Sequence, residues 1–183
     1  MSADPLYQSY HDEEWGRPVR DEHGLYERLC LEGFQSGLSW LTILRKRDGF
    51  RAAFGGFVPD DVARFTGRDV ARLVGDAAIV RHRGKIEAAI ANARATLALR
   101  ETTPLHELVW SYAPERHDAP ATPADWSAST PESRALSKRL KAAGFRFVGP
   151  TTVYAAMQAC GVVNDHLADC SVRAEVERAR RLG

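Results

Sequence analysis

Several features that define whole classes of protein are missing from this sequence of 183 residues. No apolar run approaches the roughly 20 residues that a membrane-spanning helix needs. No segment shows the strict apolar–polar alternation of a half-buried strand. The start of the chain lacks the basic and apolar stretches of a secretory signal. We therefore expect an all-α, cytoplasmic protein with no membrane association.

Cysteine and net charge are also sparse. The three cysteines Cys30, Cys160 and Cys170 cannot all pair with one another, and the first two lie in apolar helical contexts, so we expect them to be reduced core residues. The formal net charge of +1 neither requires a polyanionic partner nor excludes one, because a basic face can be hidden in a neutral total. A hydrophobic content of 44% is that of an ordinary globular chain.

Apolar residues at helical spacing predict helices along most of the chain. Asp21 and Ser39 are expected to cap two helices between residues 21 and 54. The clearest long helix is expected over residues 83–100. Residues 113–130 are rich in turn formers and are expected to form a loop that packs through Trp126. The remaining expected helices are 59–62, 67–74, 105–112, 131–143, 151–160 and 173–181.

One carboxylate interrupts an apolar helix. An ionised Glu32 among apolar groups is costly unless it is paired. It is therefore either a structural group, which caps a helix or pairs with a buried arginine, or a functional one. The rings of Tyr10, Trp15 and Trp40 would form a slot for a flat ligand, with Glu32 at the ligand's polar edge.

A helix, a glycine hairpin and a second helix occupy about residues 134–160. Gly144 can adopt the left-handed conformation that closes the first helix. Gly149 lets the backbone approach a partner, and free N–H groups at the start of the second helix would suit a phosphate. The alternative is an ordinary helical turn with a solvated basic face. The cations on that face are Arg134, Lys138, Arg139, Lys141 and Arg146.

These motifs and others resemble, in order and spacing, the bacterial 3-methyladenine DNA glycosylase I family of the helix–hairpin–helix superfamily. The resemblance covers about residues 4–170. It implies an all-α, helix–hairpin–helix glycosylase-like bundle with one domain over residues 1–183, packed N- and C-terminal ends, and a monomeric state. The matching runs are DPLY (4–7), YHD (10–12), EWG (14–16), LEG (31–33), GLSW (37–40), RHRGKI (81–86), FVG (147–149), MQACG (157–161) and VNDH (163–166).

The resemblance implies hydrolysis of the N-glycosidic bond of 3-methyladenine in double-stranded DNA, after the base has left the stack. It assigns Glu32 as the catalytic residue at the polar edge of the base, Tyr10 as a hydrogen-bonding group and Trp40 as the stacking ring. Trp15 and Tyr7 are further candidates for the pocket wall. Methylation at N3 makes the base cationic, and a carboxylate beside aromatic faces suits a cation. Free 3-methyladenine would bind as the product.

The resemblance also implies DNA contacts at the hairpin and a monofunctional reaction. Many relatives in the superfamily place a catalytic Asp in a slot that holds Asn164 here, with Asp165 as the neighbouring alternative. The nucleophilic Lys of bifunctional relatives has no counterpart at residues 150–152. We therefore expect hydrolysis without strand cleavage. The expected DNA-contacting residues are Lys138, Gly144, Arg146, Val148, Gly149 and Thr151.

His166 and Cys170 are four residues apart, which places both on one face of a helical turn and suits two zinc ligands. The family joins the matching residues to His11 and to a further cysteine near the N-terminus. No cysteine precedes His11 here, and Cys30 and Cys160 are unpersuasive substitutes. The expectation is either a structural zinc site with three protein ligands or, without zinc, hydrogen-bonded packing histidines.

Three further features stay open. The cations of residues 81–85 lie at a helix start, where positive charge interacts unfavourably with the helix dipole. We therefore expect either a phosphate or an ion pair with Asp76 or Glu87 to compensate them. The segment 173–181 is expected to be either a solvated terminus or a weak phosphate contact. His23, His106 and His117 are expected at the surface.

Two rival functions also fit the motifs. One is a binding module of the same fold that recognises alkylated bases without turnover. The other is a nucleoside hydrolase that uses the aromatic slot but not the hairpin.

Overall fold

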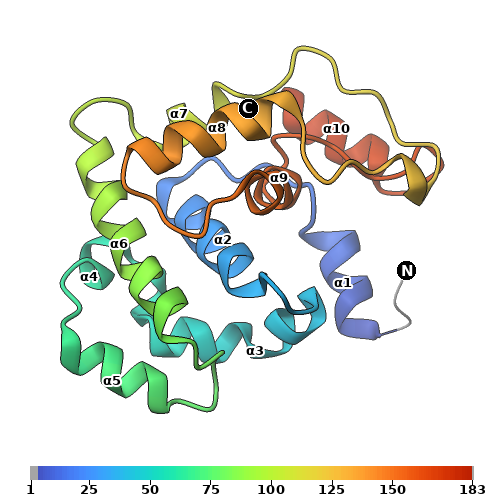
Figure 1. Cartoon of the computed structure of the whole chain (residues 1–183). Coiled ribbons are helices and arrows are strands. Elements are labelled where there is room, and N and C mark those ends of the chain that lie inside the picture. Colours follow the sequence, from blue (N-terminus) through green and yellow to red (C-terminus); the bar gives the residue numbers. More distant parts are fainter. Residues whose placement is uncertain (1–3, 183) are drawn as a thin grey trace.

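The computed structural model describes residues 4–182, and this part of the chain contains helices but no strand (Figure 1). The all-α prediction is thus confirmed. No described helix is both long and apolar enough to cross a membrane. The elements are α1 (Pro5–Glu13), α2 (Glu22–Gln35), α3 (Trp40–Ala53), η1 (Gly55–Phe57), α4 (Pro59–Val62), α5 (Gly67–Gly75), α6 (Arg83–Leu99), α7 (Leu105–Trp110), η2 (Pro123–Asp125), α8 (Pro131–Ala142), α9 (Pro150–Ala159) and α10 (Arg173–Arg181).

Side-chain caps fix the helices that position the site. The Asp21 carboxylate accepts a hydrogen bond from the Gly24 N–H at 2.7 Å, and Ser39 Oγ accepts one from the Thr42 N–H at 3.3 Å. Both predicted caps are confirmed. Helix α1 was not predicted, because Tyr10 is its one fully buried side chain and it has no continuous apolar stripe. The Asp4 side chain caps it.

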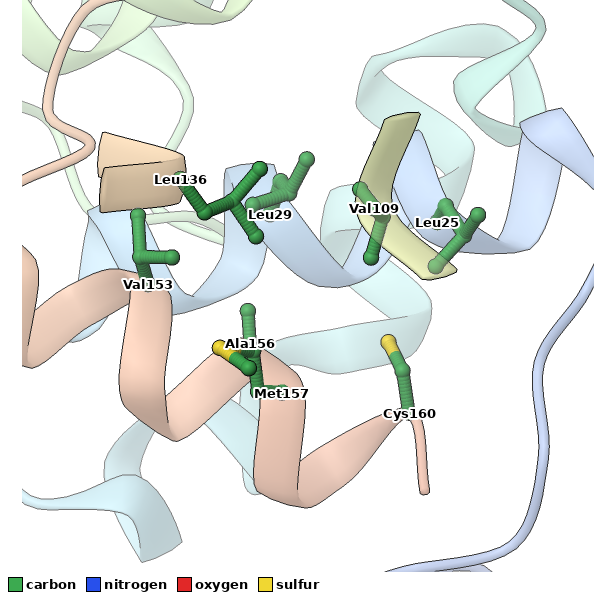
Figure 2. A pocket seen from close by; sticks show the side chains of 8 residues that line it. All are labelled: Leu25, Leu29, Val109, Leu136, Val153, Ala156, Met157 and Cys160. Atoms are coloured by element: carbon green, nitrogen blue, oxygen red, sulfur yellow. The ribbon is translucent and has the colours of Figure 1, made fainter. Parts of the chain in front are cut away.

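Helix α2 lies at the centre of the molecule and packs against α3, α6, α7 and α9 (Figure 1). Between α2, α7, α8 and α9 the side chains leave a small gap lined by apolar groups, among them Leu29, Val153 and Met157 (Figure 2). Such a gap belongs to the core and offers a ligand no polar contact. Cys30 and Cys160 are buried and free, as predicted, and burial raises the pKa of both thiols to about 12.

The loop between α7 and α8 packs through Trp126, as predicted: its Nε1 donates to the Asp165 carbonyl at 3.0 Å. The expectation for His117 was wrong. Its ring is half-buried and contacts the Asp165 carboxylate. Sequence spacing gives no sign of this contact, because the two residues belong to separate loops that meet only in the folded chain.

The two ends of the chain pack together. Gly161 has a φ of 71°, and a Cβ there would lie 2.4 Å from the Gly16 carbonyl oxygen, so this contact requires glycine. Arg17 pairs with Glu175 at 2.7 Å, and Arg180 Nε donates to the Gly161 carbonyl at 2.6 Å. Helix α10 therefore docks on the N-terminal segment and is not a fully solvated terminus.

Candidate functional site

The side chain of Glu32 is buried in the last turns of α2, and the residue is 5% exposed. Among residues 4–182 its carboxylate has no hydrogen bond and no ion pair. Burial raises the pKa of this carboxyl to about 8, while the charge of Arg28 opposes that rise. A carboxylate inside a helix is not a cap, and Arg28 makes no hydrogen bond to it. In the part of the chain that the structure describes, no cap and no direct ion pair therefore accounts for Glu32, and Arg28 acts on its carboxylate only through its charge.

The charge of this carboxylate acts on Tyr7 and Tyr10, and Trp40 packs against Tyr10, so we call Tyr7, Tyr10, Glu32 and Trp40 the Glu32 cluster. Helix α1 supplies both tyrosines, and Trp40 is the first residue of α3. The ring centroids of Tyr10 and Trp40 are 5.3 Å apart, and those of Tyr7 and Tyr10 are 6.4 Å apart. Burial and then the Glu32 charge raise the pKa of both tyrosines. The Trp40 Nε1 donor is buried and has no acceptor within residues 4–182.

The Glu32 cluster thus combines a buried acceptor and a buried donor that the protein leaves unpaired. Leaving such groups unpaired costs free energy, so a ligand that pairs with them gains affinity. A flat cation with hydrogen-bonding edges meets all these requirements, because the rings offer π faces and the carboxylate offers charge.

A charge network that the motifs did not reveal lies behind the cluster. The Glu14 carboxylate accepts hydrogen bonds from Arg47 at 2.6 and 2.8 Å and from Arg28 at 3.0 Å. Burial alone would raise the pKa of Glu14, but the two arginines lower it overall. Only one member of this network had a sign in the sequence: Arg28 is four residues before Glu32, so both lie on one face of α2.

The ring of Trp15, a predicted candidate for the pocket wall, contacts two histidines. Its ring stacks on His11 with centroids 5.9 Å apart and meets His166 edge-on at 4.7 Å. Trp15 therefore packs against His11 and His166, which lie close to Cys170.

The structure brings His11, His166 and Cys170 together, with ligand atoms within 4.8 Å of one another. His11 Nε2 lies 3.2 Å from His166 Nδ1, and Cys170 Sγ lies 3.5 Å from that same nitrogen. The helical turn predicted for His166 and Cys170 was wrong: a non-helical turn before α10 joins them. The distances nevertheless suit a shared cation.

The outer nitrogens of both rings support the same conclusion. His11 Nδ1 faces the Asp12 carboxylate at 2.7 Å, and His166 Nε2 faces the Trp15 carbonyl at 3.0 Å. If each ring donates its proton to that acceptor, two lone pairs face each other beside a thiol. A proton or a metal ion must then separate them, and zinc prefers such nitrogen and sulfur donors with outer partners of this kind.

The hairpin adopts the predicted geometry. Gly144 ends α8 with a φ of 98°, and the Phe145 N–H donates to the Leu140 carbonyl at 3.0 Å. Gly149 precedes α9, and a Cβ there would meet no atom within 4 Å, so this backbone is open to a partner. The predicted contact residues with exposed side chains are Lys138, Arg146 and Thr151.

Val148 differs from the other predicted DNA contacts because its side chain is buried. Its side chain is 1% exposed and belongs to the core, and its carbonyl accepts a hydrogen bond from Ser137 Oγ at 2.6 Å. Phe145 and Val148, at the two ends of this turn, are buried, whereas Arg146 and Phe147 between them are exposed. A phosphate can therefore meet Val148 only through its backbone N–H.

Two further residues fix the hairpin and were not predicted. Asn92 donates to the Arg146 carbonyl at 3.1 Å and accepts from the Arg146 N–H at 2.7 Å. Phe147 has a φ of 53°, and its Cβ would lie 3.4 Å from a Cβ built on Gly33. The hairpin therefore rests on α2 at the residue next to Glu32. A polar Asn92 within the apolar stripe of α6 was the available signal.

The two residues considered for the superfamily's catalytic Asp slot are both engaged within the protein. The buried Asn164 Nδ2 donates to Glu177 at 3.1 Å. The Asp165 carboxylate accepts from Tyr154 at 2.7 Å and from Gln158 at 2.6 Å. Asp165 is thus a structural anchor for the loop that precedes α8.

Lys85 and Arg83, two of the cations at the start of α6, have partners within the protein. Lys85 is buried, and its Nζ donates to the carbonyls of Phe34 at 2.8 Å and Ser36 at 2.5 Å. It thereby neutralises the C-terminal end of α2. Arg83 lies 3.5 Å from Glu87, so the ion pair with Glu87 is present. A phosphate contact by Lys85 is excluded by its burial.

A helical fold with a glycine hairpin next to an aromatic cluster around a buried carboxylate is that of a helix–hairpin–helix DNA glycosylase. Residues 1–174 match the family described as Methyladenine glycosylase. The chain belongs to this family.

Relatives agree over nearly the whole chain. The sequence is 51% identical to DNA-3-methyladenine glycosylase 1 of Escherichia coli, over 93% of this chain and 92% of that protein. A crystal structure of 3-methyladenine DNA glycosylase I matches with a TM-score of 0.89 and 48% identity, over 93% of this chain and 95% of the other. A structure on 3-methyladenine recognition by the Staphylococcus aureus enzyme matches with a TM-score of 0.89 and 36% identity, over 94% and 93%.

Proposed function

We propose that this chain is a monofunctional DNA glycosylase that hydrolyses the N-glycosidic bond of 3-methyladenine in double-stranded DNA. The observation that carries the proposal is the buried Glu32 carboxylate, which has aromatic neighbours but no partner among the described residues. Family membership supports the activity.

The Glu32 cluster selects the methylated base over unmodified adenine. A base methylated at N3 is a cation, and an unpaired carboxylate attracts it more strongly than it attracts neutral adenine. Tyr10 offers a hydroxyl and Trp40 a π face. The cationic base is already a good leaving group, so the protein has mainly to extract it from the stack, hold it and admit water.

The hairpin supplies affinity for DNA without reading sequence. The N–H groups at the start of α9 and the side chains of Lys138 and Arg146 face solvent on adjoining elements and can neutralise phosphates. Residues 150–152 contain no lysine, so no Schiff base forms there and no strand cleavage follows. Borohydride trapping of an enzyme–DNA adduct would contradict this.

The test is base release from methylated DNA by Glu32→Gln, with free 3-methyladenine binding measured by titration. Glu27→Gln is a matched control, since Glu27 is also buried on α2 but is paired with Arg51 at 2.8 Å. We expect Glu32→Gln to bind the free base at least tenfold more weakly, and the control to keep its affinity. DNA binding without any base release by the wild type would favour the binding module instead.

We also propose that His11, His166 and Cys170 hold a zinc ion as a structural link between the two ends of the chain. The support is the donor set itself, with its three atoms within 4.8 Å and both outer histidine nitrogens on acceptors. When bound, the ion supplies cross-linking and no step of base excision.

A further inference from the structure

We propose that Arg28 is a positioning residue for the base, which favours the ionised form of Glu32 and so sets the pH range over which the site accepts a cation. This inference rests on the proposed role of Glu32 as the receptor of the methylated base. It adds a residue that none of the predicted sites contains.

The Arg28 guanidinium lies beside the Tyr10 ring of the Glu32 cluster. The two residues are four positions apart on α2, so their Cβ atoms lie on one helix face at about 5–6 Å. The Arg28 side chain is 12% exposed, and its Nη2 is 3.0 Å from Glu14. Its Cζ lies 6.0 Å from the Tyr10 ring centroid. A guanidinium fixed by Glu14 and Tyr10 cannot swing away from the cluster.

The other groups around Glu32 do not replace this charge. Burial raises the pKa of Tyr7, of Tyr10 and of the Cys160 thiol, so these groups are neutral near pH 7. The Glu14 charge is offset by Arg47, so it competes only weakly for the influence of Arg28. The titratable and charged groups concerned are Tyr7, Tyr10 and Glu14 on or after α1, Arg28 on α2, Arg47 on α3 and Cys160 after α9.

Arg28 has two opposite effects on a cationic base. It stabilises the Glu32 carboxylate that attracts the base, and it repels the base directly. The first effect matters at low pH, where Glu32 would otherwise be protonated. Removal of the positive charge should therefore weaken activity at low pH and leave it equal or slightly higher at high pH. A residue with a merely structural role would lower activity at every pH.

The experiment measures single-turnover release of 3-methyladenine from methylated DNA between about pH 6 and 9. The methylated base carries a fixed charge and does not titrate in this range. The fall in rate toward acidic pH, which we call the acidic limb, therefore reports the protonation of a group on the protein. Arg28→Gln keeps a donor for Glu14 without the charge, and Arg28→Lys restores the charge. We expect the limb of Arg28→Gln to move upward by about one pH unit, and that of Arg28→Lys to stay near wild type.

Arg47→Gln is the matched control, because it removes the other partner of Glu14 from a different helix. Its acidic limb should move less than that of Arg28→Gln, because Arg47 acts on Glu32 only indirectly, by offsetting the charge of Glu14. The ionisation of Glu32 is followed directly by carbon NMR of its carboxyl group in the folded proteins. If Arg28→Gln does not fold, Arg28→Met is used in its place, and Arg28→Lys still tests the need for charge.

The outcomes separate the two proposals. A wild-type limb in Arg28→Gln, or an equal shift in Arg47→Gln, would overturn the role of Arg28. Wild-type activity and an unchanged limb in Glu32→Gln would instead overturn the role of Glu32 on which it rests.

Discussion

Two buried carboxylates in this molecule have opposite surroundings. Asp165 accepts hydrogen bonds from Tyr154 and Gln158 and contacts His117, whereas Glu32 has no such partner among the described residues. Burial raises the pKa of both, but the hydrogen bonds lower that of Asp165 overall, and that of Glu32 stays raised at about 8. A paired buried acid stabilises the fold. An unpaired buried acid lowers stability, and this cost is offset only when a ligand pairs with it.

The largest expected effect is the loss of the paired acid. Asp165→Ala leaves Tyr154, Gln158 and His117 without their acceptor in a buried site, so we expect a loss of about 3 kcal/mol in the free energy of unfolding. Glu32→Gln should leave stability unchanged or raise it. Urea denaturation of both variants beside wild type measures the contrast, and equal losses would remove the distinction between the two acids.

The pH dependence of stability should separate the acids in a second way. A carboxyl whose folded pKa is raised stabilises the protein at low pH, and this contribution is lost as pH rises from about 4.5 to about 8. Wild type should therefore lose a few kcal/mol relative to Glu32→Gln over that range. Asp165 acts at the other end, since its lowered pKa gives stability that is present above its ordinary value of 3.8 and lost as pH falls below it.

Denaturation curves at a series of pH values test this difference. The other titrating groups are common to both proteins and cancel in the comparison of wild type with Glu32→Gln. A difference that stays constant between pH 5 and pH 8, within about 0.5 kcal/mol, would show that Glu32 is not buried as an acid in solution.

The group of His11, His166 and Cys170 is an intermediate case, because its donor atoms lie within 4.8 Å of one another and we propose that a zinc ion pairs them. We expect purified protein to contain about one zinc per chain and Cys170→Ser to retain little. With free zinc at about 100 times its Kd, the bound ion adds about 3 kcal/mol to the free energy of unfolding. Elemental analysis and thermal melts with and without a chelator measure both. Cys160→Ser is the control, and equal zinc loss in it would argue against this group as the zinc site.

Interactions between residues close in the sequence could be predicted, and interactions between residues far apart in the sequence could not. The caps Asp21 and Ser39 and the turn at Gly144 depend on neighbours within a few residues, so composition sufficed to predict them. Glu32 was suspected because an acid within an apolar helix is visible at short range.

Partners distant in the sequence were hidden. Asn92 meets Arg146 across 54 positions, and Glu14 meets Arg47 across 33, without any local pattern. The contacts of the Trp15 ring with His11 and His166 were hidden as well.

The smallest expected effect concerns the support of the hairpin. Asn92→Ala leaves the Arg146 N–H and carbonyl without their partner, which should cost about 1 kcal/mol of stability and loosen the hairpin. DNA affinity should fall a few-fold while the affinity for free 3-methyladenine stays constant, because the Glu32 cluster keeps its own neighbours. Glu87→Ala, an exposed change on the same helix, is the control. Equal weakening of DNA and free-base binding by Asn92→Ala would mean that the hairpin and the base site act as one unit through the contact of Phe147 with Gly33.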